Sequence, residues 1–82
     1  MPRGRVKLPV GMERLLVSDW ERVLSEMMLG REDKEIARLY IIERVPQIDI
    51  AEELHFDRST VSRRMERILN EARRVAGKLD CL

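Results

Sequence analysis

The chain has 82 residues, a single cysteine, Cys81, and a formal net charge of +1. This length predicts one small domain of marginal stability, and a lone cysteine excludes an intramolecular disulfide and favours a reducing, cytoplasmic setting. No apolar stretch approaches the roughly 18 residues that cross a bilayer, and no signal-peptide core follows the basic start, so we expect no membrane partner.

Charge is unevenly distributed along the chain although its total is small. Residues 1–8 carry +3, residues 9–57 carry −6 and residues 58–82 carry +4. Basic ends around an acidic middle are typical of a protein that lays one face on nucleic-acid phosphates. A charge run is also common on an ordinary solvated surface, so this pattern alone does not decide between the two.

The predicted elements begin with a basic, flexible arm over residues 1–8, followed by a single helical domain over residues 9–82. A first helix is expected between Gly11 and Gly30, with Gly30 as its C-terminal cap. Its apolar residues recur every three or four positions. They are Met12, Leu15, Leu16, Trp20, Val23, Leu24 and Met27.

Two more helices are predicted before a turn. Residues 31–44 have acidic side chains in the first turn, which the helix dipole favours, and a buried stripe of Ile36, Leu39 and Tyr40. Pro46 begins a short helix that runs through Leu54. The turn is His55, Phe56 and Asp57, with Asp57 as the N-cap of the next helix.

The last helix, about residues 58–79, has the clearest periodicity. One face is apolar and predicted to be buried: Val61, Met65, Ile68, Ala72, Val75, Ala76 and Leu79. The opposite face is polar and basic: Ser59, Arg63, Arg67, Asn70 and Arg74. Period-two alternation is not sustained anywhere, so the sequence predicts an all-α, four-helix domain.

Residues 47–66 combine these features into one unit. Ala51 is small where two helices would cross, and Ile50, Leu54, Phe56 and Val61 fill the wedge between them. Together with residues before it, this unit contains a recognisable series: Ala37-Arg38-Leu39-Tyr40, Gln47, Ile50-Ala51, Leu54 and Ser59-Thr60-Val61-Ser62-Arg63-Arg64. This pattern resembles the helix-turn-helix of bacterial transcription factors. It is most similar to region four of sigma factors and to sigma-like regulators of phages and mobile elements, over about residues 31–74.

The resemblance implies a sequence-specific, DNA-binding transcriptional regulator whose long C-terminal helix is the recognition helix. Its first turns are suited to a major groove, because short side chains allow close approach and arginine can bind both guanine acceptors. The residues expected to contact bases are Arg58, Ser59, Ser62 and Arg63. Those expected to contact the DNA backbone are Gln47, Thr60, Arg64 and Arg67. His55 stands where the family has glycine.

The sequence also has features that favour other partners or functions. The apolar residues Met27, Met28 and Leu29 favour a homodimer, and the same helix suits an alternative function as a sigma-like adaptor that docks on RNA polymerase. No nucleophile and base pair, glycine-rich phosphate loop or metal-ligand spacing is found, so we expect no enzyme, no catalytic residue, no cofactor and no metal. The basic arm is expected to add affinity for DNA with little specificity.

Overall fold

The computed structural model describes Leu8 and residues 11–80. In that part of the chain it has no strand, four α-helices and one short π-helical segment. These are α1 (Val17–Glu26), α2 (Arg31–Ala37), η1 (Arg38–Ile42), α3 (Gln47–Leu54) and α4 (Arg58–Lys78). The prediction of an all-α fold is confirmed over these residues. Apart from Leu8, the predicted arm lies outside the described residues, as does Cys81.

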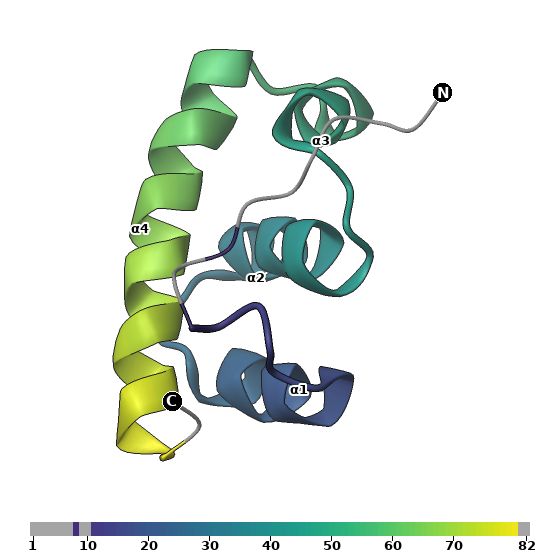
Figure 1. Cartoon of the computed structure of the whole chain (residues 1–82). Coiled ribbons are helices and arrows are strands. Elements are labelled where there is room, and N and C mark those ends of the chain that lie inside the picture. Colours follow the sequence, from purple (N-terminus) through teal and green to yellow (C-terminus); the bar gives the residue numbers. More distant parts are fainter. Residues whose placement is uncertain (1–7, 9–10, 81–82) are drawn as a thin grey trace.

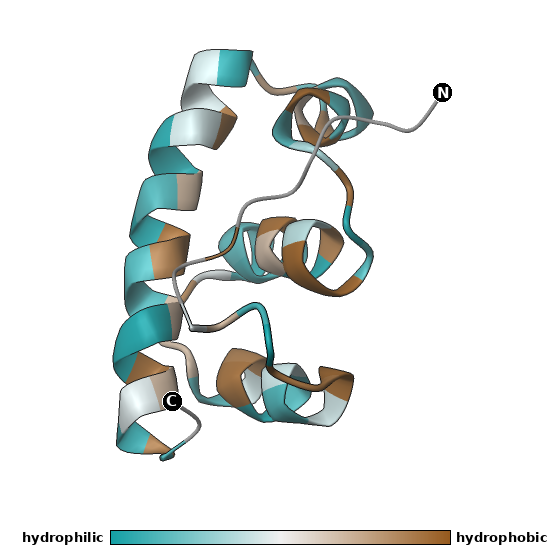
Figure 2. Ribbon diagram, viewed as in Figure 1, coloured by the Kyte–Doolittle hydropathy of each residue, from teal (hydrophilic) through white to brown (hydrophobic). Residues whose placement is uncertain are grey.

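Helix α4 forms one side of the molecule, and the other helices lie against it one after another. In Figure 1, α1 lies beside the C-terminal end of α4, α2 beside its middle and α3 beside its N-terminal end. The apolar residues of α4 lie on its side toward these helices, and its outer side is mostly polar (Figure 2). The buried residues of α4 are Val61, Met65, Ile68, Ala72, Val75 and Ala76, as predicted, with Leu79 half-buried.

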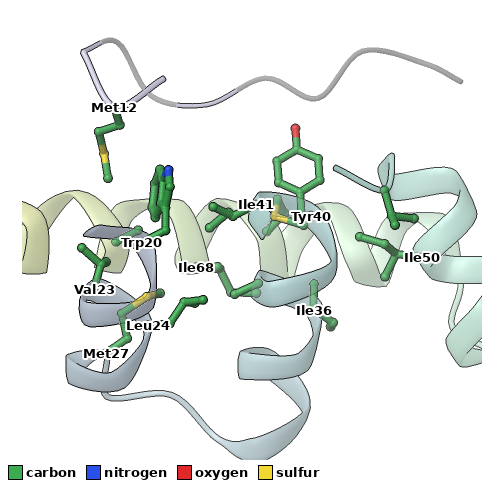
Figure 3. Packing of buried hydrophobic residues seen from close by; sticks show 14 of the residues in the cluster. Met12, Trp20, Val23, Leu24, Met27, Ile36, Tyr40, Ile41, Ile50 and Ile68 are labelled. Atoms are coloured by element: carbon green, nitrogen blue, oxygen red, sulfur yellow. The ribbon is translucent and has the colours of Figure 1, made fainter. Parts of the chain in front are cut away.

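Trp20 is the largest side chain of the core, and in Figure 3 it lies between Met12 and the C-terminal part of α4. Ile36 and Ile41 extend the same cluster toward α3. Burial of side chains of this size contributes about 1.5 to 3 kcal/mol each, so this cluster dominates the stability of the fold. The buried indole N–H of Trp20 has no hydrogen-bond partner in the described part of the chain.

Helix α1 is shorter than predicted at both ends. A left-handed φ of 87° at Gly11 begins a turn where the first helix was expected to start. The Asp19 carboxylate then accepts the Leu16 backbone N–H at 3.1 Å, which fixes the first helical residue as Val17. At the other end, Gly30 is extended (φ −68°, ψ 168°) and precedes α2, so its predicted role as the C-terminal cap of α1 is wrong.

The predicted helix over residues 31–44 is present as α2 followed directly by η1. In η1 the Glu43 backbone N–H donates to the Arg38 carbonyl, five residues back, at 3.1 Å. This wider turn is the π-helical pattern. Arg44 then takes a left-handed conformation with φ 58°, and Val45 donates to a carbonyl six residues back at 2.9 Å, which ends the helix two residues earlier than predicted.

The residues that favoured a homodimer have different environments. Met27 is buried in the chain's own core and Leu29 is half-buried against it. Met28 is 84% exposed. Two of these three apolar side chains are therefore packed within one chain. Homodimerisation stays a prediction.

An ion-pair network on α4 holds the segment between α1 and α2. The Glu71 carboxylate accepts the Met28 backbone N–H at 3.0 Å and the Arg74 guanidinium at 2.8 and 2.9 Å. The hydrogen bond from Arg74 and that from Met28 lower the pKa of Glu71 from 4.5 to about 2. Glu71 therefore stays ionised over the physiological range and links the α1–α2 connection to α4.

Candidate nucleic-acid interface

Helix α3 and helix α4 are joined by the three-residue turn that was predicted. α3 follows Pro46, whose backbone is extended (φ −64°, ψ 156°), so the predicted helix is confirmed except for the proline itself. His55 adopts the left-handed conformation (φ 62°, ψ 38°), which favours glycine. The Phe56 backbone N–H donates to the Ala51 carbonyl at 2.8 Å and closes the turn.

Asp57 directly precedes α4 with an extended backbone (φ −70°, ψ 150°), which is the predicted N-cap position. Its side chain makes no capping hydrogen bond, unlike the prediction. Its carbonyl oxygen instead accepts the Val61 N–H at 3.1 Å, which begins the regular hydrogen bonding of the helix. The first-turn amides of α4 therefore lack an acceptor from this side chain.

A buried seam fixes α3 against α4. Ile50 and Val61 are fully buried, and Ala51 is nearly so. Leu54 and Phe56 are half-buried against the same core, as expected of residues that fill the wedge between the helices. Because proteins are packed closely, a larger side chain in place of Ala51 would push the two helices apart.

One flank of this unit is exposed except at the half-buried Gln47, and we call it the open face. It consists of Gln47, Arg58, Ser59, Ser62 and Arg63. All except Arg63 line one shallow depression between α3 and the start of α4. Arg63 is exposed and lies one turn after Ser59 on the same side of the helix. The structure thus brings together the four residues expected to contact bases and one of those expected to contact the backbone.

The charges of the open face are not neutralised within the described chain. Neither Arg58 nor Arg63 forms an ion pair with any described residue. The exposed Glu66 lies one turn beyond Ser62 and is the first acidic side chain on α4. The basic part of this flank therefore covers only the first two turns of the helix.

Ile48 also lines this depression, and sequence reasoning did not identify it. Its side chain is 49% exposed, although isoleucine is usually buried. The available signal was its position, since Ile48 falls outside the buried stripe that Ile50 and Ala51 define on the same short helix. The open face thus has an apolar neighbour beside its serine and arginine side chains.

The other flank of the same helical turns lies against the start of α2. Arg64 Nη1 is 3.2 Å from both Glu32 Oε1 and Asp33 Oδ1. Arg67 Nη2 is 3.6 Å from Asp33 Oδ2. The Arg64 guanidinium also lies over the Phe56 ring, 5.0 Å from its centroid. We call these five side chains the α2–α4 clamp.

The clamp changes the surroundings of two residues that were expected to contact the DNA backbone. The hydrogen bond to Glu32 is the main cause that raises the pKa of Arg64, and the charge of Asp33 adds to it. Asp33 is largely buried, with a side chain 15% exposed, whereas that of Arg67 is 72% exposed. Arg64 is thus the more firmly held of the two arginines. Thr60, the remaining residue expected at the backbone, is half-buried.

An acidic hollow lies between η1 and α3. Two apolar side chains and four carboxylates line it. Its lining residues are Leu39, Glu43, Val45, Asp49, Glu52 and Glu53. This surface repels phosphate, so the unit has one side that suits a polyanion and one that does not.

The described residues also limit other kinds of site. None of their helices combines the length and apolar character that a bilayer crossing requires. They contain no group of three histidine, cysteine or acidic side chains placed to hold a metal ion. Comparisons of the chain with protein-family models, with curated proteins and with solved structures found no match.

Proposed function

We propose that the chain is a transcriptional regulator that binds double-stranded DNA sequence-specifically, with the first two turns of α4 in the major groove. The observation that carries this proposal is the open face, where four polar or basic side chains of the first two turns of α4 lie beside Gln47 at the start of α3. The buried seam behind them supports the proposal, because a rigid backing keeps base-reading side chains in place. So does the resemblance of about residues 31–74 to sigma region four.

The dimensions of α4 suit this role. A major groove about 12 Å wide accepts an α-helix, and two helical turns advance about 11 Å along it. Ser59 and Ser62 keep the exposed side of these turns narrow, so the helix backbone can approach the base edges. Glu66 would meet phosphate repulsion, so the contact ends after the second turn.

Each residue of the open face has a role that follows from its chemistry. Arg58 and Arg63 can each donate two hydrogen bonds to the O6 and N7 atoms of guanine. Ile48 provides an apolar surface for a thymine methyl group. Gln47 begins α3, where its amide and the backbone N–H groups are suited to a phosphate oxygen.

Selection from a library of random DNA duplexes with the purified chain, at about 0.15 M salt, tests this proposal. We expect one enriched motif that contains guanine, and binding to it that is at least about 1,000-fold tighter than to random duplex. A folded chain that enriches no motif would contradict sequence-specific binding.

Two arginine variants of the same helix locate the site. Arg63→Ala should weaken the enrichment and relax the motif at one or two base pairs. Arg73→Ala removes the same charge from an exposed position in the C-terminal half of α4 and should leave the motif unchanged. Equal effects of the two substitutions would show that the chain responds only to its total charge.

A further inference from the structure

The α2–α4 clamp pairs carboxylates of the chain with Arg64 and Arg67, two of the residues expected to contact the DNA backbone. Glu32 and Asp33 lie in the first turn of α2, about 30 residues before Arg64 in the sequence, and both accept hydrogen bonds from it at 3.2 Å. Asp33 also reaches Arg67 on the next turn of α4. Two acidic side chains thus face two of the basic side chains that flank the open face.

The partners of Arg64 neutralise its charge and also restrict its movement. Its guanidinium is bonded to α2 on one side and lies over Phe56, a residue of the turn, at 5.0 Å. The side chain is 30% exposed. To reach a phosphate it would have to leave both carboxylates and the aromatic ring, and the two carboxylates would then repel the incoming DNA.

We propose that Glu32 and Asp33 act as an internal competitor for phosphate, which restrains Arg64 and Arg67 and so suppresses sequence-independent binding to DNA. This inference rests on the proposed function. Sequence-independent affinity comes from neutralised phosphates and grows with each available cation, whereas base recognition depends on the open face. The clamp therefore favours selectivity at the expense of total affinity.

Removal of the two carboxylates tests the proposal. The variant Glu32→Gln, Asp33→Asn keeps the shape of both side chains and frees the two arginines. Binding to a random-sequence duplex should tighten, and its dependence on salt should steepen by about one to two units of log K against log salt, one for each arginine that reaches a phosphate. The affinity ratio between the selected site and random duplex should fall.

A matched control separates release of the arginines from a change in total charge. Glu13→Gln, Glu26→Gln removes two exposed carboxylates that have no basic partner among the described residues. This variant has the same net charge as the test variant. Its salt dependence should stay within about half a unit of that of the unchanged chain. An equal increase in both variants would overturn the proposal.

A second pair of variants keeps the test valid if loss of the clamp weakens the fold. Arg64→Ala, Arg67→Ala should leave the salt dependence of binding close to that of the unchanged chain, because Arg64 is already restrained and Arg67 already has Asp33 as a partner. Adding Glu32→Gln and Asp33→Asn to this double variant should then cause no increase in the salt dependence of binding. A loss of one to two units in Arg64→Ala, Arg67→Ala would show that the arginines already contact phosphate, and would overturn the proposal.

The outcomes also separate this inference from the proposed function. If the unchanged, folded chain binds neither random nor selected duplex, DNA binding itself is contradicted, and the inference fails with it. If the chain selects a DNA motif but the carboxylate variant has an unchanged salt dependence, only the inference fails. Circular dichroism at each salt concentration confirms that every variant compared is folded.

Discussion

The two flanks of the first turns of α4 are close in sequence and very different in environment. Ser62 and Arg63 belong to the open face, where no described residue neutralises the arginine. Arg64, the next residue, is bonded to Glu32 and Asp33. Arg63 and Arg64 lie about 100° apart around the helix axis. The charge of Arg63 is therefore available, whereas that of Arg64 already has partners.

This difference shows that counting charges along the chain overstates the basic surface. The segment 58–82 has a net charge of +4, which indicated a face for phosphates. Within it, Arg64, Arg67 and Arg74 have acidic partners in the chain. The available positive charge near the turn is thus concentrated on Arg58 and Arg63, which fits a small contact surface better than a broad basic patch.

The substitution Ala51→Leu should have the largest effect, because it disturbs the seam that both flanks share. Overpacking a buried position costs about 1 to 3 kcal/mol of unfolding free energy. Urea unfolding measures this loss, and DNA binding should fall with it. Glu52→Leu, at the exposed neighbouring position, should change the unfolding free energy by less than about 0.5 kcal/mol. Similar losses in both variants would show that the seam does not depend on Ala51.

Arg63→Ala and Arg64→Ala sharpen the comparison directly. Loss of Arg63 should weaken binding to the selected site by about 1 to 3 kcal/mol and relax the preference at one or two base pairs, as measured by competition titration. Loss of Arg64 should lower the melting temperature and leave the base preference intact, since its guanidinium is bonded within the chain. If Arg63→Ala weakened binding to random and selected duplexes equally, this result would argue against base recognition.

The ion pair of Glu71 with Arg74 is a reference for the clamp, because it lies on the same helix away from the open face. The folded pKa of Glu71, about 2, is below its usual 4.5, so its contribution to stability is present above pH 4.5 and lost as the pH falls toward 2. Glu71→Gln should lower the unfolding free energy at pH 7 by about 0.5 to 1 kcal/mol. Unfolding experiments between pH 7 and pH 2 should find that this difference disappears. If the difference in unfolding free energy between the two chains stayed constant with pH, the charge of Glu71 would have no role in stability.

The substitution His55→Gly should have the smallest effect, since it changes the turn between α3 and α4 without touching either flank. A left-handed conformation costs a histidine about 1 kcal/mol, and the greater freedom of glycine in the unfolded chain offsets part of the gain. We expect the unfolding free energy to rise by about 0.5 kcal/mol, with unchanged DNA affinity. Asp57→Gly, in the same turn but with a negative φ, should not stabilise the chain.

The elements that local sequence signals define were predicted closely. α3, the turn and α4 each agree with the prediction to within one residue, because a proline, a capping position and a long apolar period mark them. The start of α1 was not predicted, because the hydrogen bond from Leu16 to Asp19 overrides an apolar period that continues before it. The π-helical turn of η1 has no sequence signature of this kind.

The candidate site was predictable only in part for a related reason. Helical periodicity is a local property, and it places Ser59, Ser62 and Arg63 on one exposed side. The partners of Arg64 come from another helix, 32 and 31 residues earlier, and only the packing of α2 on α4 brings them close. Tertiary contacts therefore decide which of the predicted basic residues are available.

Backbone amide chemical shifts of the ¹⁵N-labelled chain, recorded as a duplex with the selected motif is added at about 0.15 M salt, test the central claim most directly. We expect the largest changes at Gln47, Ile48 and residues 58–63. Changes in α1, around the acidic hollow and in the C-terminal half of α4 should be small. Changes centred on α1 or on the acidic hollow, with residues 58–63 unaffected, would contradict the proposed DNA-binding face.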